Sequence, residues 1–361
     1  MRVADNEEQL ETYLNLAASV SQEHPVVISK FISDAREVEV DGVCDRTNVI
    51  LSPVMEHIEN AGIHSGDATM SLPSKTLPRS IIEKIRDNSS KIAVELGICG
   101  PFNIQYLVKG ETVFVIECNA RASRSMPYVS KSTGTNIIRL SVPIVLGNRL
   151  LDQTDAMPSE FHYFSVKVPQ FSFIRLTGAD PVSGVEMMST GEVACLGRNF
   201  SDAFTKALVA TEVSLPSKGG VLITVGGNEL KNRIVPLSVA LASIGFKIYA
   251  TEHTAQTLHE AGLDRVISLN KISEKTKKPN ILDYLLCGKI NLVINIPTIS
   301  DPSIEQQIIA DEYAIRRLAV EHNIPVVTTI ELASAIVEGL QYLKFKKPEI
   351  LALDEYVNSE A

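Results

Sequence analysis

Residues 102–124 of the chain read FNIQYLVKGETVFVIECNARASR, two largely apolar runs separated by a glycine. The runs at 101–109 and 112–119 have the length and composition of β-strands, and Gly110 suits a tight turn between them. The segment therefore predicts an antiparallel hairpin, and the pairing of its strands determines which polar side chains share a face.

The polar residues of this hairpin fall into register on one face. If Lys109 pairs with Val113 across a three-residue turn, Gln105 lies opposite Glu117. Because side chains alternate along a strand, Asn119 falls on the same face as Glu117. Two amide groups and a carboxylate then converge, and we predict that Gln105, Glu117 and Asn119 bind Mg²⁺, which accepts few protein oxygens and leaves positions for phosphate.

Two arginines follow the second strand directly. Arg121 and Arg124 lie just beyond Asn119, where guanidinium groups can neutralise the charge of a transferring phosphoryl group. We therefore predict Asn119, Arg121 and Arg124 as catalytic residues. The alternative for each residue alone is a solvated strand face with ordinary surface arginines, and the combined spacing is what favours the phosphate site.

Composition bounds the class of protein. The 361 residues are 45% hydrophobic and 21% charged, which predicts more than one packed domain and argues against disorder. The net charge of −9 argues against a nucleic acid or an anionic membrane as partner. The first residues are polar and acidic, no apolar run has the length of a membrane span, and five scattered cysteines suit a reduced, cytoplasmic protein.

A linker divides the chain into two parts with different patterns. The stretch PSKGG at 216–220 separates a predicted domain of residues 1–214 from one of residues 220–361, with 215–219 as linker. Apolar strand-like runs in the second part occur at 221–225, 246–250, 265–269, 292–296 and 325–329. Helical patterns alternate with them at 230–243, 254–261, 281–287, 308–321 and 332–340. This alternation predicts an α/β, doubly wound parallel sheet.

The first part has three further local patterns. Residues 6–9 resemble a capping box that opens a helix, and residues 78–95 carry isoleucines at helical spacing. Val38, Val40 and Val43 have acidic neighbours, which predicts a half-exposed strand pair reaching about Cys44.

The residues after the hairpin carry a resemblance to a known family. The run RASRSMPYVSK at 121–131, with its upstream strand pair, resembles the second ATP-grasp unit of carbamoyl-phosphate synthase large chains. The part after 219 resembles the methylglyoxal-synthase-like domain of that family. The resemblance implies a partial ATP-grasp α+β domain followed by a regulatory domain.

The same resemblance implies a nucleotide site. Residues 30–41 are similar to the family's hinge and ribose-binding strand, and 56–67 to a loop near the nucleotide. The implied nucleotide contacts, besides Gln105 and Glu117, are Ile32, Glu37, Gly62, Ile63, His64 and Ser65. For His64 the alternative is a turn histidine bonded locally.

The implied reaction is phosphorylation of carbamate by ATP with Mg²⁺ or Mn²⁺, giving carbamoyl phosphate for pyrimidine and arginine biosynthesis. The implied partners are a glutamine amidotransferase small subunit and the amino-terminal part of the synthase large chain. That part would include the glycine-rich phosphate loop, and no such loop precedes Val26. We therefore expect the chain to be inactive alone.

The second domain is expected to bind a small effector where its strands end. Nucleotide binding is implied for this module by the resemblance. The predicted ligand residues, with Thr224 and Thr329 nearby, are Lys231, Thr251, Thr254, Lys271, Asn295 and Thr298. Helix caps and solvated lysines are the alternative interpretation.

Two other functions are alternatives to the synthase hypothesis. A methylglyoxal-forming lyase needs acidic groups after its strands, whereas Asn295 leads into Ile296, Pro297 and Thr298. A stand-alone regulatory nucleotide-binding fragment without catalysis remains the alternative, because the catalytic domain is incomplete.

Overall fold

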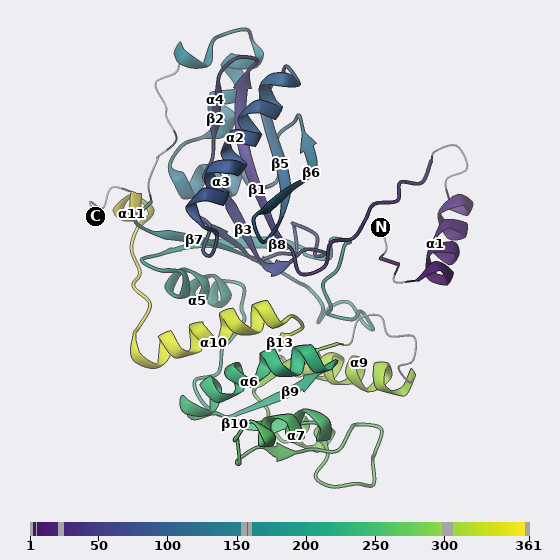
Figure 1. Ribbon diagram of the computed structural model, residues 1–361. Helices are drawn as coiled ribbons and strands as arrows, with labels where there is room; N and C mark the ends of the chain where they lie inside the picture. The colour runs from purple at the N-terminus through teal and green to yellow at the C-terminus, as the bar shows by residue number, and fades with distance from the viewer. Residues whose placement is uncertain are drawn as a thin grey trace.

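A computed structural model describes residues 3–4, 6–20, 25–152, 157, 161–297 and 306–357. These residues form two β-sheets, one of eight antiparallel strands and one of five parallel strands. Figure 1 shows the eight-stranded sheet in the upper half of the view and the five-stranded sheet in the lower half. In the described part of the chain no helix is both long enough and apolar enough to cross a membrane.

The antiparallel sheet has the strand order β6-β5-β1-β3-β4-β7-β8, with β2 paired to β1. Its strands are β1 (Arg36–Asp45), β2 (Val49–Leu51), β3 (Met55–Asn60), β4 (Met70–Leu72), β5 (Cys99–Lys109), β6 (Thr112–Asn119), β7 (Phe164–Gln170) and β8 (Gly191–Gly197). Only a tight turn separates β5 from β6, so the two strands pair with each other. In the strand order β6 forms one edge of the sheet.

Helices cover both faces of this sheet. The covering helices are α2 (Arg79–Glu95), α3 (Ser125–Thr133), α4 (Ile137–Val145) and α5 (Phe200–Ala210), with a short 3-10 turn η1 (Leu150–Asp152), whereas Figure 1 shows α1 (Glu7–Val20) apart from the sheet. The predicted helix at 78–95 is confirmed as α2, which buries Ile81 and Ile85 against one face. The predicted cap of the first helix is also present, since the Asn6 side chain accepts the Gln9 N–H at 2.9 Å.

The prediction of a half-exposed strand at 38–44 is wrong. In β1 every residue from Glu37 to Cys44 is buried, including the acidic ones. Val38 and Val40 pack in one apolar cluster, while Glu37, Glu39 and Asp41 occupy the opposite face of the strand. The strand was predicted, but its polar face turns toward other polar groups and away from solvent.

The register of the β5–β6 hairpin is partly as predicted. Lys109 pairs with Thr112, so the turn has two residues and the predicted pairing of Lys109 with Val113 is wrong. A β-bulge then leaves Ile116 without a partner in this ladder and shifts the register by one residue. Beyond the bulge Gln105 lies opposite Glu117, as predicted.

The parallel sheet has the order β11-β10-β9-β12-β13 and confirms the predicted alternation of strands and helices. Its strands are β9 (Gly220–Val225), β10 (Lys247–Ala250), β11 (Ile267–Ser268), β12 (Leu292–Ile296) and β13 (Val326–Val327). Its helices are α6 (Asn228–Ser243), α7 (Glu252–Glu260), α8 (Ile281–Leu286), α9 (Gln306–Glu321) and α10 (Ile330–Phe345). One face packs against α6, α7 and α10 and the other against α8 and α9, as a doubly wound sheet requires.

The two sheets share one apolar cluster through α5 and α10, which lie side by side in Figure 1. Polar contacts reinforce this packing at Glu338 in α10, whose carboxylate accepts from Lys75 at 2.5 Å and from Ser201 at 2.7 Å. After α10 the chain returns toward the antiparallel sheet and ends its described part in α11 (Leu353–Val357).

Candidate functional site

The polar face of the β5–β6 hairpin gathers the predicted metal ligands. Gln105 lies opposite Glu117, and Asn119 is two residues further along β6, opposite Asn103. The Asn119 amide donates to the Glu117 carboxylate at 2.7 Å, which places both side chains on one face. The structure therefore brings the three predicted oxygen donors together.

This donor set suits a hard cation that also holds phosphate. Glu117 is exposed and Gln105 and Asn119 are half-buried, so solvent or a ligand can reach them. The described residues contain no cluster of three His, Cys, Asp or Glu side chains able to hold a metal by themselves. One carboxylate and two amides fit Mg²⁺ or Mn²⁺ bound jointly with phosphate oxygens, because Mg²⁺ rarely uses an all-protein cage.

The two predicted arginines lie at the end of this face. Arg121 donates to the Asn119 side-chain oxygen at 3.2 Å and to the Ala122 carbonyl at 3.1 Å. Arg124 is exposed and its guanidinium contacts the Met187 sulfur. Both cations thus border the oxygen donors, with Arg124 directed toward the loop between β7 and β8.

A buried row of carboxylates on β1 lies beside these donors and was missed in the sequence. Glu37 was predicted as a ribose contact, but Glu39 and Asp41 were not assigned. Asn103 on β5 donates its amide to Glu39 and to Asp41, at 2.9 Å each. The pattern EVEVD at 37–41 was the available signal, since a period of two places all three carboxylates on one face.

His57 on β3 balances part of this charge. Its Nε2 lies 3.2 Å from Glu39 and its Nδ1 4.0 Å from Glu37. Burial alone lowers the pKa of His57, but the hydrogen bond to Glu39 and the charge of Glu37 raise it above its ordinary value. Burial likewise opposes ionisation of Glu39, yet His57 and Asn103 hold its pKa below the ordinary value. These directions describe an imidazolium paired with a carboxylate.

The outer two carboxylates of the row have raised pKa values. Burial raises the pKa of Glu37, His57 opposes this shift, and the charges of Glu39 and Glu117 add to it. Burial and the adjacent charge of Glu39 raise the pKa of Asp41 to about 7, although Ser123 and Asn103 donate to it. Glu117, one of the exposed donors, is thus among the charges that raise the pKa of a carboxylate in the buried row.

The predicted nucleotide-binding segments also approach one another. Phe31, beside Ile32, lies against Gly62: a Cβ added to Gly62 would meet the Phe31 ring at 3.3 Å. Gly62 has a φ of +113°, a conformation that favours glycine. Ile63, His64 and Ser65 follow it and are half-buried.

His64 is bonded within its own loop, which is the alternative foreseen for it. Its Nδ1 accepts the Gly66 N–H at 3.0 Å, and its backbone N–H donates to the Gly184 carbonyl at 2.7 Å. The Ser65 carbonyl accepts from Lys167 at 3.0 Å. Within the described residues no hydrogen bond engages Nε2 of His64, so this ring nitrogen can serve a ligand.

A second candidate site lies at the carboxyl ends of the parallel strands. A hollow of about 200 Å³ there is bordered by the predicted Lys231, Thr251, Thr254 and Lys271 and by Thr224. Asn295 lies beneath it, fully buried, and donates to the Thr224 hydroxyl at 2.5 Å. Thr298 lies outside the described residues. Thr329 caps α10 instead, accepting the Leu332 N–H at 3.3 Å.

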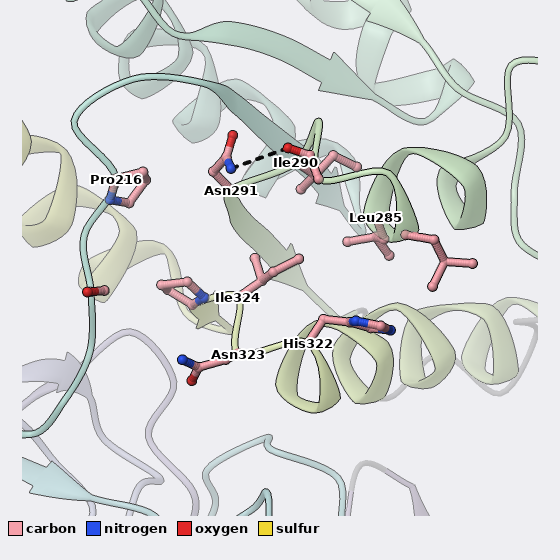
Figure 2. Close-up of a pocket in the computed structure, with 11 residues that line it drawn as sticks. Pro216, Leu285, Ile290, Asn291, His322, Asn323 and Ile324 are labelled. Carbon is pink, nitrogen blue, oxygen red and sulfur yellow. Dashed lines mark hydrogen bonds between the residues drawn. The ribbon is translucent and has the colours of Figure 1, made fainter.

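A larger hollow of about 390 Å³ lies at the opposite end of the same sheet (Figure 2). Asn291 precedes β12 and Ile324 precedes β13, so both border it from the amino ends of the strands. Pro216 of the linker forms another wall, and His322 is its one titratable side chain. Ligands of open α/β sheets bind at the carboxyl ends, so the smaller hollow is the better candidate.

Comparison with known proteins agrees with both parts of the chain. Residues 1–153 match the family model for the carbamoyl-phosphate synthase L chain, ATP binding domain. Residues 233–328 match the model for the MGS-like domain.

Relatives match over nearly the whole chain. The carbamoyl phosphate synthase large chain, C-terminal section, of Methanocaldococcus jannaschii is 40% identical, covering 98% of this chain and 58% of that protein. The carbamoyl phosphate synthase large chain of Methanothermobacter thermautotrophicus is 37% identical over 99% of this chain and 33% of that protein. Multifunctional protein pyr1-3 of Dictyostelium discoideum is 41% identical over 96% of this chain and 15% of that protein.

The chain thus spans 58% or less of each of these relatives. It combines an ATP-binding domain and an MGS-like domain in the order of the synthase's carboxyl-terminal section. The chain carries the ATP-binding domain of carbamoyl-phosphate synthase large chains followed by an MGS-like domain, and over nearly its whole length it corresponds to the carboxyl-terminal part of those large chains.

Proposed function

We propose that this chain supplies the carbamate-phosphorylating site of a carbamoyl-phosphate synthase, using ATP with Mg²⁺ or Mn²⁺. The observation that carries the proposal is the convergence of Gln105, Glu117 and Asn119 on one strand face, with Arg121 and Arg124 at its end. The ATP-binding family match over residues 1–153 supports the nucleotide as phosphoryl donor.

The residues act by position and charge. Glu117, with the Gln105 and Asn119 amides, would hold the cation. When bound, the cation would neutralise phosphate charge and orient the phosphate oxygens. Arg121 and Arg124 stabilise the charge that develops on the transferred phosphoryl group. Glu37 accepts from the ribose hydroxyls, while backbone near Ile32 meets the adenine. The Nε2 of His64 and the Ser65 hydroxyl offer further donors to the nucleotide.

The proposed phosphorylation of carbamate also needs parts of the synthase other than this chain. The phosphate-covering loop, the amino-terminal part of the large chain and an ammonia-supplying glutamine amidotransferase are the partners that we propose. The isolated chain is therefore expected to show little or no turnover of ATP with carbamate. Full turnover by the 361 residues alone would contradict this.

A complementation assay tests the proposal directly. The chain is co-expressed with the part of the M. jannaschii C-terminal section that has no counterpart here, and carbamoyl phosphate is measured with radiolabelled bicarbonate, ammonia and ATP. We expect product from the pair and none from the pair carrying Glu117→Gln. An associated pair that binds ATP yet forms no product would overturn the proposed reaction.

The second candidate site supports regulation by a nucleotide effector. Two lysines and three hydroxyl groups around a hollow at the strand ends suit a phosphorylated ligand. Thermal-shift titrations with UMP, IMP and ATP separate the hypotheses. Stabilisation by a nucleoside monophosphate without any ATP effect would favour the stand-alone regulatory fragment over the catalytic one.

A further inference from the structure

We propose that Asp41 is a positioning residue: through Ser123 it holds the segment that carries Arg121 and Arg124 in place for phosphoryl transfer. The inference rests on the proposed function and extends it to residues that contact no substrate. Asp41, Ser123 and Asn103 together are called the latch below.

The latch joins the loop after β6 to the centre of the sheet. The Ser123 hydroxyl donates to Asp41 Oδ1 at 2.6 Å, and the same oxygen accepts from Asn103 Nδ2 at 2.9 Å. Ser123 also accepts the Met126 N–H at 3.3 Å at the start of α3. One side chain therefore fixes the loop both to β1 and to the helix that follows.

The arginines depend on this loop for their position. Residues 120–124 belong to neither β6 nor α3, and both arginine side chains are exposed, so packing does not fix them. Ser123 lies between the two arginines and is the half-buried residue of that stretch. A guanidinium displaced by about 1 Å loses much of its effect on a transition state, so fixing the backbone here matters for catalysis.

The burial of Asp41 indicates a role beyond folding. The residue is fully buried, and within the described part of the chain its Oδ2 has no hydrogen-bond partner. An unsatisfied carboxyl oxygen in the interior costs stability, and a hydrophobic side chain would avoid that cost. A buried carboxyl group that lowers stability at this position fits a function of Asp41 in positioning the segment that carries Arg121 and Arg124.

The proposal is tested on the full chain with two probes, inorganic phosphate and Mn²⁺. Phosphate reports on the arginines, and Mn²⁺ reports on Gln105, Glu117 and Asn119, which precede the latched loop. The variants are Ser123→Ala, which removes the donor, Ser123→Thr, which keeps it, and Asp41→Ala beside Asp41→Asn, which keeps an acceptor oxygen. Ser141→Ala is the matched control, since it removes a buried hydroxyl that only bonds the Ile137 carbonyl.

We expect Ser123→Ala and Asp41→Ala to weaken phosphate binding about tenfold while Mn²⁺ affinity stays within twofold. Ser123→Thr, Asp41→Asn and Ser141→Ala should bind phosphate within about threefold of the unmodified chain, by the same reasoning. A general loss of structure would lower both affinities together, so the split between probes distinguishes positioning from stability.

The binding experiment distinguishes an error in the latch proposal from an error in the proposed function. If the unmodified chain binds both probes and Ser123→Ala binds phosphate equally well, the latch is wrong and the function stands. If Ser123→Ala loses Mn²⁺ as well, the contact is structural only. If the unmodified chain binds neither probe, the proposed function fails and the latch with it.

Discussion

Arg316 in α9 forms a two-point ion pair with Asp180, with Nε 2.7 Å from Oδ1 and Nη2 2.5 Å from Oδ2. The remaining Nη1 donates to the Asn295 side chain at 2.7 Å, and Asn295 donates to Thr224, which borders the smaller hollow at the carboxyl ends of the parallel strands. Asp180 belongs to the loop between β7 and β8, whose Gly184 carbonyl accepts the His64 N–H. These hydrogen bonds, together with the backbone of the loop between β7 and β8, therefore connect the hollow beside Thr224 with the loop that carries His64.

Replacing Arg316 by methionine should lower the free energy of unfolding by about 2–3 kcal/mol, because it removes charged hydrogen bonds from a side chain that is only 3% exposed. Urea denaturation measures the change. Arg233→Met is the control: that arginine pairs with Glu331 but is 42% exposed, so its loss should cost less than about 1 kcal/mol. Equal losses in the two variants would contradict the importance of the Arg316 contact.

Glu117→Gln should weaken Mn²⁺ binding about tenfold or more, since it removes the one carboxylate of the donor set. Titration followed by electron paramagnetic resonance gives the affinity. Glu111→Gln, in the exposed hairpin turn, loses the same charge nearby and should leave the affinity unchanged. If both variants bind Mn²⁺ like the unmodified chain, the cation site lies elsewhere.

Asp41→Asn should change how stability depends on pH. Burial raises the pKa of Asp41 from its ordinary 3.8 to about 7, so between these values the folded chain holds a proton that the unfolded chain releases. The free energy of unfolding then falls as pH rises through this window, by at most about 1.4 kcal/mol per pH unit from this group. Asparagine does not titrate, so the advantage of the variant should grow from pH 4 to pH 7. Parallel profiles for the two proteins would show that Asp41 titrates normally.

If the smaller hollow binds a nucleotide as proposed, Lys271→Met should weaken binding of UMP about tenfold, because it removes a charged donor from the lining of that hollow. The stabilisation by UMP in a thermal-shift assay should shrink accordingly. Lys275→Met, on the same loop but exposed and outside the hollow, is the matched control. An equal response of both variants to UMP would show that Lys271 does not contribute to UMP binding.

The parallel sheet was predictable because short stretches of sequence are enough to identify each of its strands and helices. Each apolar run of five residues became a strand at the predicted place, although β10, β11 and β13 are shorter than their runs. Buried parallel strands read as continuous apolar segments and amphipathic helices as periodic ones, so neither requires knowledge of distant contacts. The last helical element, α11, was not predicted, because its short sequence has little periodicity of its own.

The candidate site was predictable only in part. The pairing of Gln105 with Glu117 is confirmed, but through a shorter turn and a compensating bulge at Ile116 that no local pattern indicates. The burial of Glu39 and Asp41 depends on Asn103 and His57, which lie on other strands. The alternation of valines with acidic residues therefore predicted that these acids face solvent, where acidic side chains are usually found.

The return of the chain after α10 has a consequence for motion. Tyr356 is buried against the antiparallel-sheet half of the molecule, where Lys206 donates to its hydroxyl at 2.8 Å and the Tyr163 ring lies 6.2 Å away. The chain therefore crosses between the two halves both at the linker near Gly219 and before this terminal anchor, in addition to the contacts that Glu338 and Arg316 make with the antiparallel-sheet half. A wide hinge movement between the halves would break the anchor at Tyr356 and these contacts, whereas a small sliding of α10 along α5 would keep them.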